Sequence, residues 1–183
     1  SFNHKMSIGK RFQLVIKGQM KKSWWSLVLQ IDIIKKLLVL LTTKKMTWLE
    51  LVLREEGRDF TSDQEVPDDV SCAFALSTLL HEYNPKIPIL ISTVSLNAYM
   101  ASSPYFQEVK QPIDKMEAGW ICISVTGSGN GSIRGHAGVY VNENEIMSNS
   151  SATGLWSKNY TRQTWRDRYY KLGGMSTHIY KLV

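Results

Sequence analysis

The sequence predicts an α+β fold in which N-terminal helices pack on a small antiparallel β-sheet. The helical patterns come first, at 47–54 and 71–83, where apolar residues recur at helical spacing. Short runs bounded by turn residues follow at 119–125, 136–141 and 145–150, and such runs are typical of strands. Helices grouped before strands in this way indicate the α+β class.

The first helix has a clear start signal at Thr47. Its hydroxyl can cap free N–H groups of the first turn, and Glu50, three residues later, completes a capping box. The helix is expected to run through Arg54, with Gly57 as its terminator. A polar, turn-rich run at 58–70 then leads to the next helix.

The second helix is predicted over 71–83, because the following Asn84-Pro85 pair cannot continue it. One face of this helix is mainly apolar, so that face should contact the sheet. This face consists of Cys72 and the residues four, seven and eleven positions after it, which are Leu76, Leu79 and Tyr83.

Two loops of different character separate the predicted strands. The first, at 126–135, is rich in glycine, and the second, at 142–144, is short and polar. A last helix is predicted from about Thr161 to the pair Gly173-Gly174, and a short strand at 178–183 follows it.

Charge divides the 183-residue chain into two parts. The net charge is +6, but residues 1–45 alone hold ten basic residues and one acid, while the remainder holds 12 basic residues and 15 acids. The basicity therefore belongs to an N-terminal arm, residues 1–45, and the main domain, residues 46–183, is slightly acidic. The overall charge consequently does not indicate an anionic partner for the main domain.

Within the arm, the run 24–41 is the most apolar stretch, but Gln30, Asp32 and the pair Lys35-Lys36 interrupt it. Charges near the centre of a spanning helix oppose insertion, so this run is not expected to cross a membrane. Three interpretations stay open: a basic amphipathic segment on an anionic membrane, a poor signal peptide starting near Met20, or a helix packed on the main domain.

The two cysteines form neither a disulfide framework nor a zinc-binding pattern, so no metal or other cofactor is expected. Cys72 lies at the start of the second helix, where unpaired N–H groups and the helix dipole favour a thiolate. We therefore expect its thiol to ionise readily and to act as a nucleophile, the alternative being a small buried side chain. Cys122 lies in the middle of a strand and is expected in the core.

His136 is the best candidate for a base among the four histidines. Glycines flank it at 135 and 138, so its ring can stand over a cleft at the start of a strand. His81 lies nine residues after Cys72 on the same helix, too far along the axis for a hydrogen bond. His4 lies in the basic arm without further context, and His178, at the start of the last strand, is expected to be a surface or packing residue.

Strand parity identifies a third residue. If the second and third strands are joined by a two-residue loop at 143–144, Gly138 lies opposite Asn149, which then shares a face with His136. A four-residue loop gives the same register, but a three-residue loop places Ser148 there instead. Asn149 is therefore predicted to orient the imidazole, with Ser148 as the alternative.

Cys72, His136 and Asn149 together follow the logic of a thiol triad of nucleophile, base and orienting residue. Backbone N–H groups at the helix start, from Ser71 and Cys72, would meet the negative charge that develops on a carbonyl oxygen during attack.

These residues resemble the NlpC-type and CHAP-like cysteine peptidases, a papain-like fold that cuts peptidoglycan. The matching segments are SCAFAL around Cys72, GHAGVYV around His136 and IMSNSS around Asn149. More narrowly, the segments 126–141, 146–156 and 159–174 are similar to small phage and prophage proteins of that superfamily described as cell-wall hydrolases. The similarity covers about 51–180 and leaves the arm uncovered.

The sequence departs from the family pattern at two positions. Trp120 stands where the superfamily often has an aspartate, and many relatives use a second histidine as the orienting residue. The assignment of Asn149 therefore depends on the parity argument and on asparagine variants of the superfamily.

The resemblance implies an endolysin-like endopeptidase or amidase that cleaves a peptidoglycan amide through a thioester, at the cell envelope or in a phage particle. An inactive wall-binding or phage structural module of the same fold is the alternative. No nucleic-acid partner is expected, because the sequence contains no zinc finger or RNA-binding signature. The arm could associate with a membrane surface or a phage particle.

Two further segments have open interpretations. The loop 126–135 could form a wall of the substrate cleft or a flexible connection; it lacks the ending of a P-loop. The last helix carries basic and aromatic residues, which suit either an anionic polymer or a solvated face above aromatic packing. These residues are Arg162, Trp165, Arg166, Arg168, Tyr169 and Lys171.

Overall fold

The computed structural model describes residues 29–35, 46–62, 66–67, 71–110 and 115–183. The chain divides into two compact units, 1–45 and 46–183. In the first unit, 29–35 form a short helix. Most residues on which the three interpretations of the arm depend lie outside the described part. None of the described helices combines the length and the apolar character needed to cross a bilayer.

The first two helices of the main domain confirm the sequence prediction. α2 comprises Trp48–Arg54, and its capping box is formed: the N–H of Thr47 donates to the Glu50 carboxylate at 2.8 Å, and the N–H of Glu50 donates to the Thr47 hydroxyl at 3.3 Å. α3 comprises Cys72–Tyr83 and ends at Asn84. Local signals suffice here because each helix carries its own start and stop residues.

Loss of this cap should lower stability measurably. We expect Thr47→Ala to reduce the free energy of unfolding by about 1 kcal/mol, because an N–H group of the first turn loses its acceptor. Urea unfolding measures the change. Ser102→Ala is the control, since the Ser102 hydroxyl donates to the Ala98 carbonyl at the other end of a helix and caps no free N–H group. An equal change in both variants would contradict this explanation.

Three elements of the structure have no counterpart in the sequence prediction: α4 (Thr93–Ser102), β1 (Phe106–Glu108) and β5 (Trp156–Thr161). α4 has a side-chain cap, in which the Ser92 hydroxyl accepts the N–H of Val94. Its buried positions are few, and they are Thr93, Leu96 and Met100. Such a weak apolar pattern does not identify a helix without its tertiary contacts.

The predicted last helix is in fact two segments. α5 (Arg162–Trp165) is a short α-helical turn, and η3 (Arg166–Leu172) continues it as a π-helix. Trp165 and Tyr169 are both buried, with ring centroids 4.6 Å apart. Both rings pack in one cluster with Cys122, Tyr140 and Ile146 of the sheet. The arginines at 162, 166 and 168 lie at the intermediate or exposed surface, so aromatic packing below a solvated face describes this segment.

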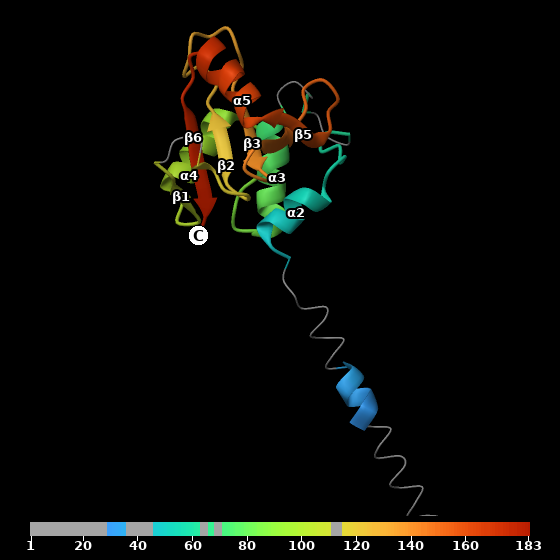
Figure 1. Ribbon diagram of the computed structural model, residues 1–183. Helices are drawn as coiled ribbons and strands as arrows, with labels where there is room; N and C mark the ends of the chain where they lie inside the picture. The colour runs from blue at the N-terminus through green and yellow to red at the C-terminus, as the bar shows by residue number, and fades with distance from the viewer. Residues whose placement is uncertain (1–28, 36–45, 63–65, 68–70, 111–114) are drawn as a thin grey trace, which may run out of the picture. The chain divides into compact units, whose positions relative to one another are not determined.

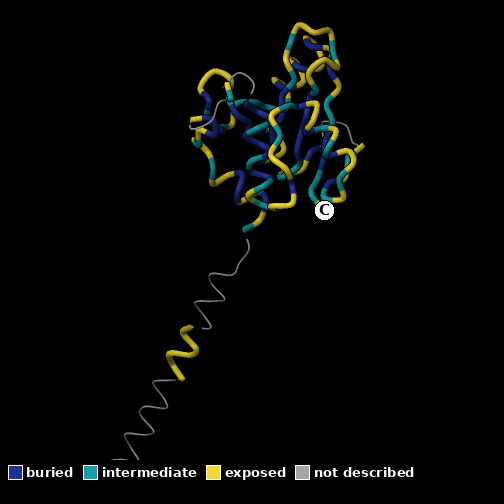
Figure 2. Tube along the Cα trace, turned by 180° about the vertical axis from the view of Figure 1, so that it is seen from behind, coloured by how far each residue is buried: buried dark blue, intermediate teal, exposed yellow. Residues whose placement is uncertain are grey.

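The strands form one six-stranded antiparallel sheet in the order β1-β6-β2-β3-β4-β5, which confirms the α+β prediction. The remaining strands are β2 (Ile121–Ser124), β3 (His136–Tyr140), β4 (Glu145–Asn149) and β6 (Thr177–Leu182). The central strands β2 and β3 are buried along their whole length, as the dark segments in Figure 2 show.

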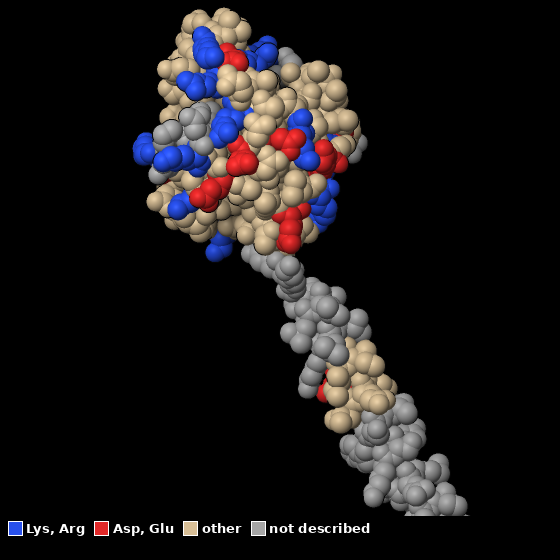
Figure 3. All heavy atoms as spheres, viewed as in Figure 1, with Lys and Arg blue, Asp and Glu red and all other residues tan. Residues whose placement is uncertain are grey.

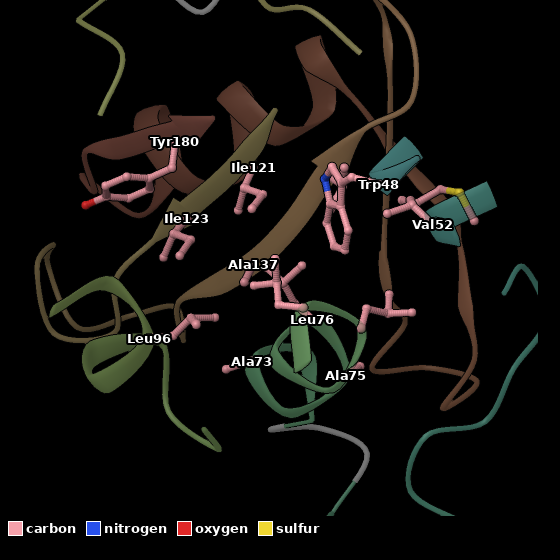
Figure 4. Close-up of a cluster of buried hydrophobic side chains, with 14 of the residues drawn as sticks. Trp48, Val52, Ala73, Ala75, Leu76, Leu96, Ile121, Ile123, Ala137 and Tyr180 are labelled. Carbon is pink, nitrogen blue, oxygen red and sulfur yellow. The ribbon is translucent and has the colours of Figure 1, made fainter. Parts of the chain in front are cut away.

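Two apolar clusters cover the two faces of this sheet. On one face, α3 packs through Leu76 against Ile121, Ile123 and Ala137 (Figure 4). The other cluster joins β2, β3 and β4 to α5 and η3, and it consists of Met116, Cys122, Tyr140, Ile146, Trp165, Tyr169, Met175 and Ile179. Figure 1 shows α3 alongside β3, with α5 at the end of the sheet where β3 begins. As expected, Cys122 belongs to the core.

Candidate active site

The thiol of Cys72 is held at the N-terminus of α3. The side chain is 7% exposed, and the main-chain N–H groups of Ala137, Ala73 and Cys72 itself are its hydrogen-bond partners. Burial raises the pKa of the Cys72 thiol to about 11, and these N–H groups offset only part of the effect. The expectation of a readily ionised thiol was therefore wrong, because loss of solvent outweighs the helix terminus.

His136 begins β3, and its ring is held in one orientation. Its Nε2 lies 2.8 Å from the Ser148 hydroxyl, which in turn donates to Oδ1 of Asn159 at 2.6 Å. Because Ser148 gives its only proton to Asn159, it accepts the N–H of the imidazole. The other ring nitrogen, Nδ1, is then unprotonated and can accept a proton.

The imidazole is neutral in the resting protein. Burial and, to a smaller extent, the positive charge of Arg168 together lower the pKa of His136 to about 3. The thiol and the ring are thus both uncharged at neutral pH, in place of a thiolate–imidazolium pair.

The predicted register of the hairpin was wrong, and its three-residue alternative is found. Val139 pairs with Met147, and continuation of this register places Ser148, not Asn149, beside Gly138. The reason is the side chain of Asn142, whose Oδ1 accepts the N–H groups of residues 144 and 145 at 2.9 and 2.8 Å. This local turn lengthens the loop by one residue and shifts the strand that follows.

Asn149 consequently lies on the other face of the sheet. Its side-chain N–H₂ donates to the hydroxyl of Ser71, the residue before Cys72, and its Oδ1 is buried without a hydrogen-bond partner. It therefore contacts the helix of the nucleophile and not the imidazole. The orienting position is occupied by Ser148, with Asn159 of β5 behind it.

An aromatic cluster of Tyr160, Trp165 and Tyr169 encloses His136 on the face opposite the body of α3. Tyr169 stacks on the imidazole, with centroids 5.7 Å apart and planes 7° apart. Tyr160 and Trp165 lie 5.4 and 5.6 Å away. One stacked and two tilted ring contacts thus hold the imidazole in place.

α3 covers the face of the sheet opposite the imidazole, but the thiol of Cys72, at the N-terminus of α3, lies near the main chain that follows His136. Ala137, whose N–H contacts the thiol, is the residue next to His136. Tyr169, which stacks on the imidazole, is also close enough to Cys72 for an electrostatic interaction with it. The thiol and the imidazole therefore have two neighbours in common: Ala137, which follows His136 in the chain, and Tyr169.

A groove of about 260 Å³ opens beside the imidazole. Its lining comes from the loop 126–135, the start of β3, the turn after β4, β5 and η3. It consists of Ser132, Ile133, Arg134, Gly135, His136, Ser151, Tyr160, Arg168 and Tyr169. His136 thus borders an open space as predicted, whereas Cys72 does not line it. Basic side chains gather over this end of the domain (Figure 3).

The other candidate residues from the sequence have structural contacts elsewhere. His81 bonds through Nδ1 to the carbonyl of Ile87 at 2.7 Å, and His178 bonds to Glu108 at 3.0 Å. His4 lies outside the described residues. In the described ranges, no three His, Cys, Asp or Glu side chains are grouped to hold a metal ion.

Sequence reasoning missed Asn159 and the enclosing role of Tyr160. Both belong to β5, which was not predicted, because its sequence WSKNYT is largely polar. The alternation of Trp156, Lys158 and Tyr160 with smaller polar residues is the one strand-like signal in this segment.

No protein-family model matches the chain, and no curated protein matches it.

Proposed function

We propose that this protein is a cysteine hydrolase of the papain-like NlpC/CHAP type, acting on an amide bond of bacterial peptidoglycan. The observation that carries the proposal is that the Cys72 thiol contacts the main chain of Ala137, the residue after His136, while Tyr169 both stacks on the imidazole and interacts electrostatically with Cys72. A helix-leading thiol beside an imidazole of defined tautomer is what nucleophilic acyl transfer requires.

The mechanism begins from two neutral groups. As the sulfur of Cys72 attacks the carbonyl carbon, Nδ1 of His136 takes the thiol proton, so the charge develops only during the reaction. The N–H groups of Ala137, Ala73 and Cys72, which now surround the sulfur, are the candidate donors to the oxygen that becomes negative. Collapse of this intermediate releases the amine, which takes the proton from His136, and leaves a thioester.

Hydrolysis of the thioester uses the same groups, and the proton now returns to the sulfur. His136 removes a proton from water, the hydroxide attacks the thioester, and the thiol leaves with the proton returned to sulfur. Ser148 and Asn159 act as positioning residues, because they hold Nε2 and so keep Nδ1 unprotonated.

Peptidoglycan is proposed as substrate because of the resemblance around Cys72, His136 and the following strand, together with an antiparallel α+β fold compatible with that family. On this proposal the protein acts at the cell envelope or from a phage particle, as an endolysin does, and residues 1–45 attach it to a membrane surface or to the particle. No organic cofactor or metal takes part in the proposed steps.

Digestion of purified peptidoglycan tests the proposal. The full chain should release soluble fragments with new amino groups and without new reducing sugar ends, because an amide and not a glycosidic bond is cut. Mass spectrometry of the fragments then identifies the bond. Absence of new amino groups, with wall binding intact, would contradict the proposal.

Substitutions of Ser148 and Asn149, which are neighbours on β4, test which of them orients the imidazole. The register of the structure assigns this role to Ser148, whereas the predicted register assigned it to Asn149. We expect Ser148→Ala to lower kcat about 10- to 100-fold with little change in KM, because the imidazole loses its partner. Asn149→Asp is the matched variant: it places a charge beside Ser71 and should act on stability first. Equal kcat for Ser148→Ala and wild type would contradict the positioning role.

The second candidate function is a wall-binding or phage structural module of the same fold without chemistry. The burial and raised pKa of Cys72 favour it. It predicts that the protein sediments with peptidoglycan, releases nothing, and does not react with iodoacetamide at neutral pH. Labelling of Cys72 that depends on an intact His136 would count against it.

A further inference from the structure

A second pocket, of about 720 Å³, lies at the end of the sheet away from His136. Ser124 of β2 pairs with His136, and Trp120, which lines the pocket, precedes Ser124 by four residues. At about 3.3 Å per strand residue, this separation is about 13 Å. The described lining residues of the pocket and of the groove beside His136 have no member in common. The pocket is therefore a separate site, and its volume is typical of small-molecule sites, roughly 300–1,000 Å³.

Three of the lining side chains lie in a row across the neighbouring strands β1, β6 and β2 (Figure 1). Gln107 pairs with Lys181, and the pairing of Ile121 with Tyr180 places Trp120 beside Lys181 when the register continues by one residue. Residues that lie directly opposite each other project from the same face of a sheet. Gln107, Lys181 and Trp120 thus share the face that packs against α5 and η3.

The indole of Trp120 is held in place by the protein itself. The N–H of Trp120 donates to the carbonyl of Glu117 at 3.1 Å, and its carbonyl accepts the N–H of Tyr140 at 2.8 Å. The intervening turn contains Gly119 at φ +88°, a conformation that favours glycine. The indole packs in part against the apolar cluster beside η3, and it is only partly buried. The remaining ring surface is an apolar platform in the wall of the pocket.

The polar side chains around this platform are available to a ligand. Within the described ranges, no side-chain hydrogen bond or ion pair engages Gln107, Lys115, Glu117 or Lys181, all of which line the pocket. The ammonium groups are donors, the carboxylate is an acceptor, and the amide of Gln107 is both. The pocket therefore combines an aromatic surface with donors and acceptors of hydrogen bonds.

This combination of groups favours a sugar over other ligands. An anion could use the two lysines, but it would be repelled by the carboxylate of Glu117. A purely apolar ligand would leave the charged side chains without partners. A pyranose ring has an apolar face of C–H groups, which can cover the indole, and a rim of hydroxyls, each of which donates and accepts.

We propose that this pocket binds a pyranose sugar stacked on Trp120, and that its ligand is the glycan strand of the cell wall. The sugar site is argued from the pocket itself, whereas the assignment to wall glycan rests on the proposed hydrolase function. The domain then holds a glycan strand at one end of the sheet while the peptide is cut at the other end.

The experiment measures binding of the β-1,4-linked trimer of N-acetylglucosamine to the full-length protein by isothermal titration. We expect a Kd below about 1 mM. Trp120→Ala should weaken binding at least about tenfold, because the stacking surface is lost, and Glu117→Ala at least about threefold, because hydroxyls of the sugar lose an acceptor. Tyr170→Ala is the matched control: Tyr170 is a 60% exposed aromatic residue on η3 that does not line the pocket, and its affinity should stay within about twofold of wild type.

The proposal is overturned if the trimer does not bind at millimolar concentration, or if Trp120→Ala and Glu117→Ala both bind it as wild type does. Inorganic phosphate is the second probe: tighter binding than the trimer, lost in Lys181→Gln, would overturn the assignment to a sugar. Thermal melting checks that each variant is folded, and the exposed Glu117 gives the decisive variant if Trp120→Ala is not folded.

The two proposals fail separately. Binding of the trimer does not depend on catalysis, so trimer binding without digestion of peptidoglycan would refute the hydrolase and leave the sugar site standing. Digestion of peptidoglycan without trimer binding would refute the sugar site alone.

Discussion

Cys72→Ala is expected to reduce the release of amino groups from peptidoglycan by at least about a thousandfold, because the covalent step of the proposed mechanism needs the thiol. Binding of the wall should persist, since the groove beside His136 is lined by other residues. Fluorescamine detection of new amines measures the rate, and sedimentation with the wall measures binding.

Cys122→Ala is the matched control for this result. Cys122 is also buried, but its thiol lies in the middle of β2 and donates to the Gly138 carbonyl at 3.6 Å. Its replacement leaves a small cavity and should cost about 1–2 kcal/mol of stability with little loss of rate. If both cysteine variants digest peptidoglycan as wild type does, the catalytic role of Cys72 is refuted.

The second prediction with a large expected effect concerns the dependence of the free energy of unfolding on pH. The pKa of His136 is about 3 in the folded protein and near 6.5 in the unfolded chain. A depressed folded pKa contributes stability that is present above pH 6.5 and is lost as the pH falls toward 3, because only the unfolded state takes up the proton. Between pH 7 and pH 4 the loss from this residue alone should be about 3 kcal/mol.

His136→Gln tests the assignment. Its amide can still donate to Ser148, and it does not titrate, so urea unfolding at pH 7 and pH 4 should show a loss smaller than that of wild type by about 3 kcal/mol. The lowered pKa values of Glu55, Asp59, Glu108 and Asp167 also favour unfolding in acid, but they act equally in both proteins. Parallel losses in wild type and His136→Gln would contradict the buried neutral imidazole.

Elements with complete local signals were predictable from the sequence, and elements without them were not. The capping box of Thr47 and Glu50 and the Asn84-Pro85 stop defined α2 and α3 almost to the residue. β5 has a polar sequence and becomes a strand through its pairing with β4. Strand pairing is a long-range interaction, so the pattern of one segment does not reveal it.

The residues of the candidate site likewise differ in whether the sequence alone could predict them. The sequence pointed to Cys72 and His136 because helix start and strand start are local features, but the third residue depended on a register that one Asn142 side chain changes. A shift of one residue moves a side chain to the opposite face of a sheet, and Ser148 thereby replaced Asn149 beside the ring.

The sequence by itself determined the class of the fold, the basic arm at 1–45, and the two side chains on which the proposed chemistry depends. Only the tertiary structure decided their charge states: a helix terminus favours a thiolate, but removal of Cys72 and His136 from water disfavours the charged form of each. Hydration is lost through the packing of segments far apart in the chain, and for that reason no local pattern reports it.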